Sequence, residues 1–162
     1  MLIVSNTSPL SNLGMIGQLP LLQQIYPKVI IPPMVHSELM RLSVIQTEIT
    51  SLIMLGWLEI QPVMDQGMLE ILSNRLDPGE AAAITLAIEL SADRLLIDER
   101  LGRKIAIQYG LKIRGIIGIL SNAKATGLIP TLRPLLDELM EQAGFRLSTE
   151  LYERTLREVG EF

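Results

Sequence analysis

Short apolar runs alternate with longer amphipathic stretches along this chain. An apolar run bounded by turn residues is typical of a buried strand, and apolar residues at spacings of three and four are typical of a helix. Strands that alternate with helices favour a parallel sheet with both faces covered. We therefore predict an α/β fold of three layers (α/β/α), with a short central parallel sheet of about five strands. The predicted strands are Leu2–Ser5, Lys28–Ile31, Trp57–Val63, Arg94–Asp98 and Leu111–Arg114.

The intervals between these runs carry the apolar spacing of helices. Thr7 or Ser8 can cap the first helix, with Pro9 near its first turn. The other predicted helices are Leu19–Tyr26, one continuous helix from Pro33 to Gly56, Met68–Leu76, Pro78–Glu89, Leu101–Tyr109, Gly115–Thr126, 131–142 and 148–159. We expect residues 1–162 to form a single domain, on which the C-terminal helices at about residues 131–160 pack.

The composition narrows the chemistry that the chain can perform. It has no Cys and one His, which excludes disulfide scaffolds, thiol catalysis and His-rich metal sites. Aromatic residues make up 4%, so base stacking is not expected as the main mode of nucleic-acid binding. The net charge of -4 argues against a protein that coats nucleic acid by charge alone.

The mean hydropathy of +0.35 raises the question of a membrane segment. Polar residues interrupt every apolar run before it reaches the length of a spanning helix, about 18 residues. No Lys or Arg precedes Lys28, so the chain has no basic region of the kind that opens a signal peptide. Together with the absence of Cys, this predicts a cytoplasmic protein with no membrane association.

Polar residues that follow the predicted strands are the main candidates for chemistry, because ligands of parallel sheets bind beyond the carboxyl ends of the strands. The candidates are Asn6 after the first strand, Glu38 in the helix after the second, Glu80 in the first turn of a helix, and Asp98 at the end of the fourth strand. Two carboxylates about 4 Å apart repel by roughly 4 kcal/mol at an effective dielectric of about 20. A cation such as Mg²⁺ or Mn²⁺ would offset this repulsion and favour attack of water on a phosphodiester.

Each of these acids also has an ordinary structural interpretation. Glu80 could stabilise a helix dipole, Glu38 could be an exposed helix acid, and Asp98 or Glu99 could cap helix Leu101–Tyr109. The distribution of charge along the chain also has two interpretations. Residues 93–124 carry seven basic and three acidic side chains, whereas residues 137–162 carry three basic and seven acidic ones. A basic segment beside strand-end acids suits a phosphate backbone, and a solvated helix face explains it as well.

Four motifs are distinctive in combination. They are Ile3-Val4-Ser5-Asn6-Thr7-Ser8-Pro9-Leu10, Leu76-Asp77-Pro78-Gly79-Glu80-Ala81, Leu95-Leu96-Ile97-Asp98-Glu99-Arg100 with Gly102-Arg103, and Gly127-Leu128-Ile129-Pro130 with Arg133-Pro134-Leu135-Leu136. Together they resemble the PIN-domain nucleases, and more closely the DUF3368 group of small bacterial and archaeal PIN proteins. The resemblance covers nearly the whole chain. It implies a PIN-like fold and a metal-dependent ribonuclease, often the toxin half of a toxin–antitoxin pair.

The resemblance also implies roles for individual positions. A site for Mg²⁺ or Mn²⁺ would be formed by Asn6, Glu38, Glu80 and Asp98, the last three being the catalytic acids. Glu99 would belong to its outer shell. The implied partners are RNA and an antitoxin protein. The residues expected to line the site or hold substrate phosphate are Thr7, Ser8, Arg100 and Arg103.

Asn6 departs from the family pattern, which has Asp at this position. An amide oxygen can still ligate Mg²⁺ but adds no charge, so metal affinity and activity should fall. The leading hypothesis is an endoribonuclease weakened at this position. The alternative is a catalytically inactive PIN fold that binds RNA or a partner.

A phosphotransfer domain of the receiver type is a third hypothesis. Such a domain carries paired acids after its first strand, where this chain has Asn6-Thr7-Ser8, and the sequence therefore disfavours it. The leucine-rich helices exceed what a single small core easily buries, and this predicts a homodimer.

Overall fold

The sheet has five short parallel strands, and its order confirms the predicted α/β class. The computed structural model describes residues 1–162, with sheet order β3-β2-β1-β4-β5. All four pairings between neighbouring strands are parallel. The first strand is therefore the central one. The strands are β1 (Ile3–Ser5), β2 (Val29–Ile31), β3 (Leu58–Ile60), β4 (Arg94–Leu96) and β5 (Ile113–Arg114).

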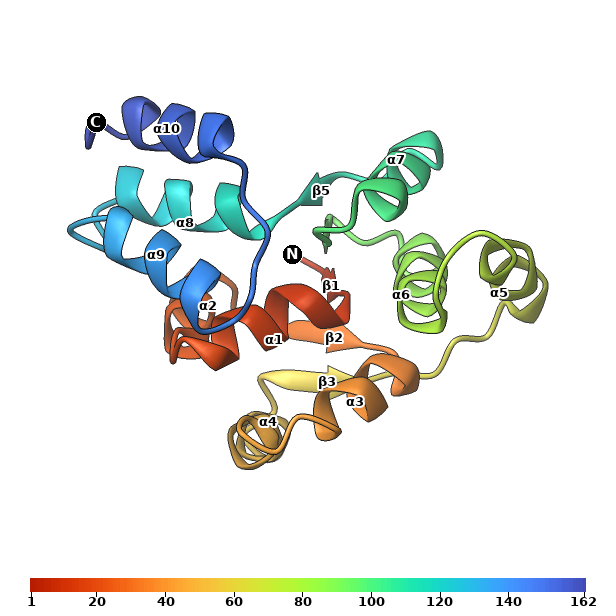
Figure 1. Ribbon diagram of the computed structural model, residues 1–162. Helices are drawn as coiled ribbons and strands as arrows, with labels where there is room; N and C mark the ends of the chain where they lie inside the picture. Colours follow the sequence, from red (N-terminus) through yellow and green to blue (C-terminus); the bar gives the residue numbers. More distant parts are fainter.

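Ten helices flank the sheet. They are α1 (Thr7–Met15), α2 (Leu19–Ile25), α3 (Pro33–Met40), α4 (Gln46–Met54), α5 (Gln66–Ser73), α6 (Pro78–Glu89), α7 (Arg100–Gln108), α8 (Ile116–Ala125), α9 (Arg133–Glu141) and α10 (Thr149–Glu158). Figure 1 shows α1, α2, α8 and α9 on one side of the strands and α5, α6 and α7 on the other. After β3 the strand order reverses toward β4 and β5, and right-handed crossovers place α5, α6 and α7 on the opposite face from α1 and α2.

The core is aliphatic and lies on both faces of the sheet. Its 41 buried residues form one cluster, to which every strand except the short β5 contributes. Ile3 and Val4 are neighbours on β1, so their side chains point to opposite faces, yet both are fully buried. Burial on both faces explains why these strands are continuous apolar runs without alternation.

One sequence prediction is wrong: the region from Pro33 to Gly56 is two helices, α3 and α4, not one. Between them, the amides of Leu42 and Ile45 bond three residues back, to the carbonyls of Leu39 and Leu42, which tightens the chain into turns. The Gln46 side chain donates to the carbonyl of Met40 at the end of α3. Ile45 is buried, and its Cγ2 lies 3.0 Å from where a Cβ of Gly14 would be. The bend thus seats Ile45 against α1 while keeping the apolar spacing of a continuous helix.

The C-terminal helices are tied to the rest of the fold at both ends. Helix α9 packs against α1. At the far end, the Glu161 carboxylate accepts hydrogen bonds from the backbone N–H groups of Leu132 and Arg133 and from Lys124. The connection between α9 and α10, residues 142–148, lies between these anchors. The longest helix, α6, has 12 residues, and no helix combines the length and hydropathy that a membrane span requires.

Candidate active site

The candidate site lies where the strand order reverses, between β1 and β4. All the strands are parallel, but β2 and β3 are added on one side of β1 and β4 and β5 on the other. The crevice at the carboxyl ends of the strands at such a point is the usual ligand site of open parallel sheets. Asn6 follows β1, and its backbone N–H donates to the carbonyl of Leu96, the last residue of β4, at 2.9 Å. Asp98 comes two residues later. Two of the predicted positions, Asn6 and Asp98, therefore follow neighbouring strands.

Asn6 is buried, with 4% of its surface exposed. Its side-chain amide makes no hydrogen bond within the protein, and the residue does not cap α1 with its side chain. The buried side-chain atoms without a partner belong to Ser8, Tyr26, Arg94 and Asp98, so the amide of Asn6 is within reach of solvent or a ligand.

Asp98 is held by one oxygen and leaves the other without a partner. Its Oδ1 accepts from the backbone N–H of Ile116, the first residue of α8, at 2.8 Å, whereas Oδ2 is buried and unpaired. Burial raises the pKa of Asp98 to about 6, although the Ile116 hydrogen bond and the Arg103 charge oppose the rise. Asp98 thus bonds to the start of α8, and neither it nor Glu99 caps α7 through its side chain.

Glu80 lies in the first turn of α6, which Asp77 caps by accepting from the Glu80 N–H at 2.8 Å. Burial raises the pKa of Glu80 to about 8, with further contributions from Asp77 and from the charges of Glu99 and Glu38. A carboxylate that only served the helix dipole would have a lowered pKa. Glu80 is instead close to other acids and largely shielded from water.

Glu38 is oriented by a neighbour from another element. The Thr7 hydroxyl at the start of α1 donates to its Oε2 at 2.6 Å. A Cβ on Gly79 would lie against the same carboxylate, 2.6 Å from Oε2 and closer still to Oε1. Gly102 fits the same pattern, because a Cβ there would lie 3.3 Å from Glu80 Oε2 and 2.8 Å from Ile97 Cδ1. Both glycines leave space that the two glutamates use.

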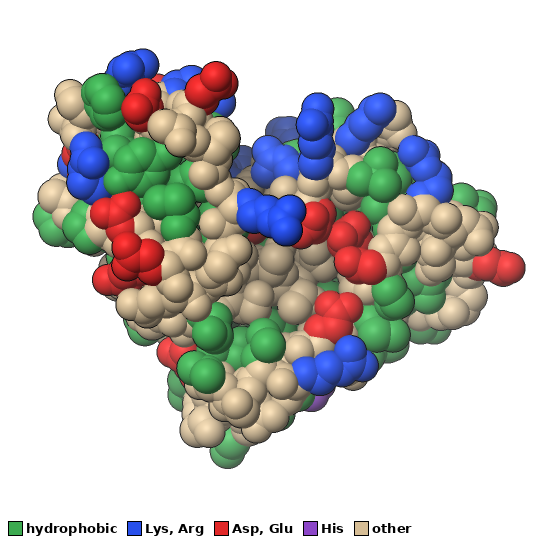
Figure 2. All heavy atoms as spheres, in the orientation of Figure 1, with side chains coloured by type: hydrophobic (Ala, Val, Ile, Leu, Met, Phe, Trp, Pro, Cys, Tyr) green, Lys and Arg blue, Asp and Glu red, His purple; other side chains and the backbone are tan.

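Two cavities meet at Asp98. The larger has a volume of about 610 Å³ and opens between α7, α8 and α10, and the smaller, of about 440 Å³, is lined by Ser8, Asn12 and Glu99. Asp98, Phe145 and Arg146 line both. Figure 2 shows the molecule hollowed here, with basic side chains around acidic ones. The Ser8 hydroxyl is buried without a hydrogen-bond partner.

The predicted site residues come from four neighbouring segments but do not close around one point. Thr7 contacts Glu38, the charge of Glu38 acts on Glu80, and Asp98 lines a cavity with Ser8. Nowhere in the chain are three Asp, Glu or His side chains grouped so that they could hold a metal ion. The donors still fit a hard divalent cation in kind, since all are oxygens and Asp98 Oδ2 is buried without a partner. Their assignment as metal ligands remains a prediction.

Several residues of the site were missed from the sequence. The larger cavity is also lined by Arg114 from β5 and by Arg146 and Arg154 from the C-terminal region. Residues 137–162 carry a net negative charge, so nothing in the sequence indicated that Arg146 and Arg154 of this region face the site. Gly79 and Gly102 lie within the motifs quoted above, but their role depends on contacts across elements.

The structure thus has a five-stranded parallel sheet with acidic side chains near its switch point. The chain matches the family model DUF3368, described as a PIN domain, over residues 2–161. The protein therefore belongs to this family of PIN-domain proteins, as its motifs predicted. No curated protein matches it.

Proposed function

We propose that this protein is a metal-dependent endoribonuclease of the PIN type and the toxin component of a toxin–antitoxin pair. One observation carries the proposal: at the switch point of a PIN fold, Asp98 presents a buried oxygen with no partner, and the charge of Glu99 acts on both Asp98 and the crowded acid Glu80. A buried carboxylate in this condition is costly unless a ligand supplies the missing interaction. Such a ligand is either a cation or a hydrogen-bond donor.

The proposed ligands of Mg²⁺ or Mn²⁺ are Asn6, Glu38, Glu80 and Asp98. When bound, the ion would supply Lewis acidity and make water a better nucleophile toward a phosphodiester. Thr7 holds the Glu38 carboxylate in place, and the Ile116 N–H holds one oxygen of Asp98 while the other is left without a partner. Ser8 lines the site, Glu99 adds outer negative charge, and Arg100 and Arg103 line the cavity where substrate phosphate would lie.

Cleavage of single-stranded RNA in Mg²⁺ or Mn²⁺, with EDTA as the metal-free control, tests this proposal. We expect cleavage by the wild-type protein, its loss in EDTA, and its loss in Asp98→Asn and Glu80→Gln. Glu70→Gln is a matched control, because Glu70 is an exposed acid on α5, outside both cavities. Cleavage by Asp98→Asn at the wild-type rate would remove the proposal.

A second candidate function is supported by Asn6 and by the lack of a three-carboxylate group. In this alternative, the protein is an inactive PIN fold that binds RNA or a partner protein. Calorimetry with Mn²⁺ separates the two, because the inactive form predicts no binding even at high metal concentration. Asn6→Asp restores the missing charge, and a gain of cleavage in that variant would support the enzyme.

The partners follow from the same proposal. RNA is the substrate, an antitoxin protein is the proposed regulator, and we propose a homodimer. Several large apolar side chains are exposed around α4, with exposed fractions of 74% for Val44, 83% for Met54 and 75% for Leu55. Sedimentation of the purified protein would report the dimer, and a monomer at all concentrations would contradict it.

A further inference from the structure

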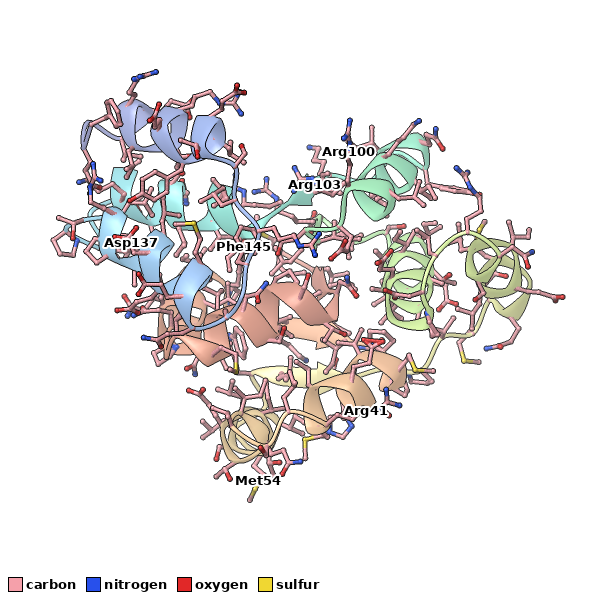
Figure 3. All side chains as sticks on the ribbon, in the orientation of Figure 1. Arg41, Met54, Arg100, Arg103, Asp137 and Phe145 are labelled. Atoms are coloured by element: carbon pink, nitrogen blue, oxygen red, sulfur yellow. The ribbon has the colours of Figure 1, made fainter.

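The larger cavity collects positive charge in a chain whose net charge is negative. Of its 12 lining residues, five are arginines and one, Asp98, is acidic. The arginines come from α7, β5, the α9–α10 connection and α10, and they are Arg100, Arg103, Arg114, Arg146 and Arg154. We call this cavity the arginine cleft. Figure 3 shows Arg100 and Arg103 on one side of it and Phe145 on the other.

None of these five guanidinium groups is paired with a carboxylate. The salt bridges of the protein join Lys28 to Glu59, Lys124 to Glu161 and Arg157 to Glu153, all outside the cleft. Only Arg103 has an internal partner, the carbonyl of Ile97 at 3.1 Å. Five arginines without a salt bridge around one cavity repel one another, so the cleft is arranged for an anionic ligand with several charges.

The C-terminal region supplies one wall of the cleft. Arg146 lies on the α9–α10 connection and Arg154 on α10, and both side chains are exposed. The arginines of α7 and β5 form the opposite wall. Phe145 and Arg146 also line the smaller cavity, so an extended ligand would pass between the two walls and reach Asp98.

We propose that Arg146 and Arg154 clamp the phosphate backbone of single-stranded RNA in the arginine cleft and lead it to Asp98. This inference rests on the proposed function and deepens it, because it assigns a substrate-binding role to a region with a net negative charge. The planar fork of arginine matches phosphate oxygens, and a single strand presents one such charge per nucleotide. Because the cleft opens at Asp98, an RNA strand in it would bring a phosphodiester to the candidate acids. An acidic peptide has no phosphodiester, so its binding beside the candidate acids would serve no cleavage reaction.

The experiment measures RNA binding without cleavage. A labelled single-stranded RNA of about 10 nucleotides is titrated with the full-length protein in EDTA, and fluorescence anisotropy is recorded over a range of salt concentrations. We expect Arg146→Gln and Arg154→Gln each to weaken binding on the order of 5-fold, and each to reduce the salt slope by about 0.7 per lost phosphate contact. Arg154→Lys should recover part of the loss, since lysine keeps the charge but not the fork.

Arg157→Gln is the matched control, since Arg157 lies on the same helix α10, is exposed, and pairs with Glu153 outside the cleft. It should bind RNA within about 2-fold of the wild type. Unchanged RNA affinity in both Arg146→Gln and Arg154→Gln would overturn the proposal. A labelled polyglutamate peptide is titrated in the same way. If the arginine variants lose affinity for the peptide and keep their affinity for RNA, the cleft is a peptide site and the proposal is overturned. If the arginine variants lose RNA but the wild type never cleaves it, the clamp stands and the nuclease proposal fails.

Discussion

Two regions of the molecule bury carboxylates in opposite ways. At the C-terminal end, Glu161 is largely buried, yet three donors surround it: two backbone N–H groups and the Lys124 ammonium. Burial alone would raise its pKa, but these hydrogen bonds outweigh burial and lower it. At the candidate active site, which we call the sheet edge because it lies beyond the carboxyl ends of the strands, Glu80 and one oxygen of Asp98 are buried with few donors, and burial raises the pKa of both acids.

The difference separates a structural acid from a candidate functional one. The fold can satisfy a buried carboxylate, as it does at Glu161, where the carboxylate ties the chain end to α8 and α9. At the sheet edge the neighbours of Glu80 are instead other acids, and Asp98 Oδ2 is left unpaired. Perturbed acids that cluster in a cleft are typical of functional sites.

The largest expected effect is a loss of RNA cleavage, without a loss of stability, when an acid of the sheet edge is replaced. Asp98→Asn should reduce RNA cleavage by about 10²- to 10⁴-fold, because it removes the charge that would hold a cation. The melting temperature should stay within a few degrees of the wild type, because the amide oxygen can still accept from Ile116. Cleavage rates and thermal melts on the same preparation check both parts. An unfolded variant would place Asp98 with the structural acids.

At the opposite end, Glu161→Gln should destabilise the fold without affecting the site. A neutral amide faces two N–H groups and an ammonium there, at a cost of about 1–3 kcal/mol, or a fall in melting temperature of about 3–8 °C. The pKa of Glu161 is lowered in the folded state, so its contribution is present above the unfolded pKa and is lost as pH falls through the folded one. Melts from neutral to acidic pH should therefore converge with the wild type. A constant gap would contradict the ionic explanation.

Gly79→Ala tests whether the position of the Glu38 carboxylate at the sheet edge matters for cleavage. The added Cβ would collide with the Glu38 carboxylate, which is the free end of a side chain and can move away from Thr7. We expect cleavage to fall about 10-fold, equivalent to about 1.4 kcal/mol. The melting temperature should not fall, since Ala favours the helix over Gly by about 1 kcal/mol. Gly67→Ala on α5 is the control, because its nearest neighbour, Asp65 Oδ1, lies at an ordinary 3.6 Å.

The smallest expected effect is a gain of stability from Glu80→Gln in metal-free protein. The pKa of Glu80 rises from 4.5 to about 8 on folding, so its contribution is fully present below pH 4.5 and is lost as pH rises through about 8. The glutamine variant should melt with the wild type near pH 4 and about 2–4 °C above it near pH 9. Equal melting temperatures at both pH values would mean that Glu80 is not crowded in solution.

The sequence was sufficient for the fold because its signals are local. Continuous apolar strands and helices with glycine or proline at their ends are read within a few residues, and β1 to β5 lie inside the predicted runs. The division between α3 and α4 could not be read, because it depends on Ile45 reaching Gly14 of another helix. The apolar spacing is the same with or without that bend.

The candidate site was only partly readable for the same reason. Asn6 and Asp98 could be selected because each follows a strand in the sequence. Arg146 and Arg154 could not, because their position opposite α7 depends on how α9 and α10 return across the molecule. The unpaired oxygen of Asp98 likewise depends on Ile116 from another element.

The central place of β1 has a consequence for biosynthesis. Of the five strands, β1 is synthesised first, but its pairing is complete only after β4 is made, because the N–H of Asn6 donates to the carbonyl of Leu96. Contacts so distant in sequence form late in folding. A nascent chain would therefore emerge without its cleavage centre, and under the proposed function it could not cut the message from which it is being translated.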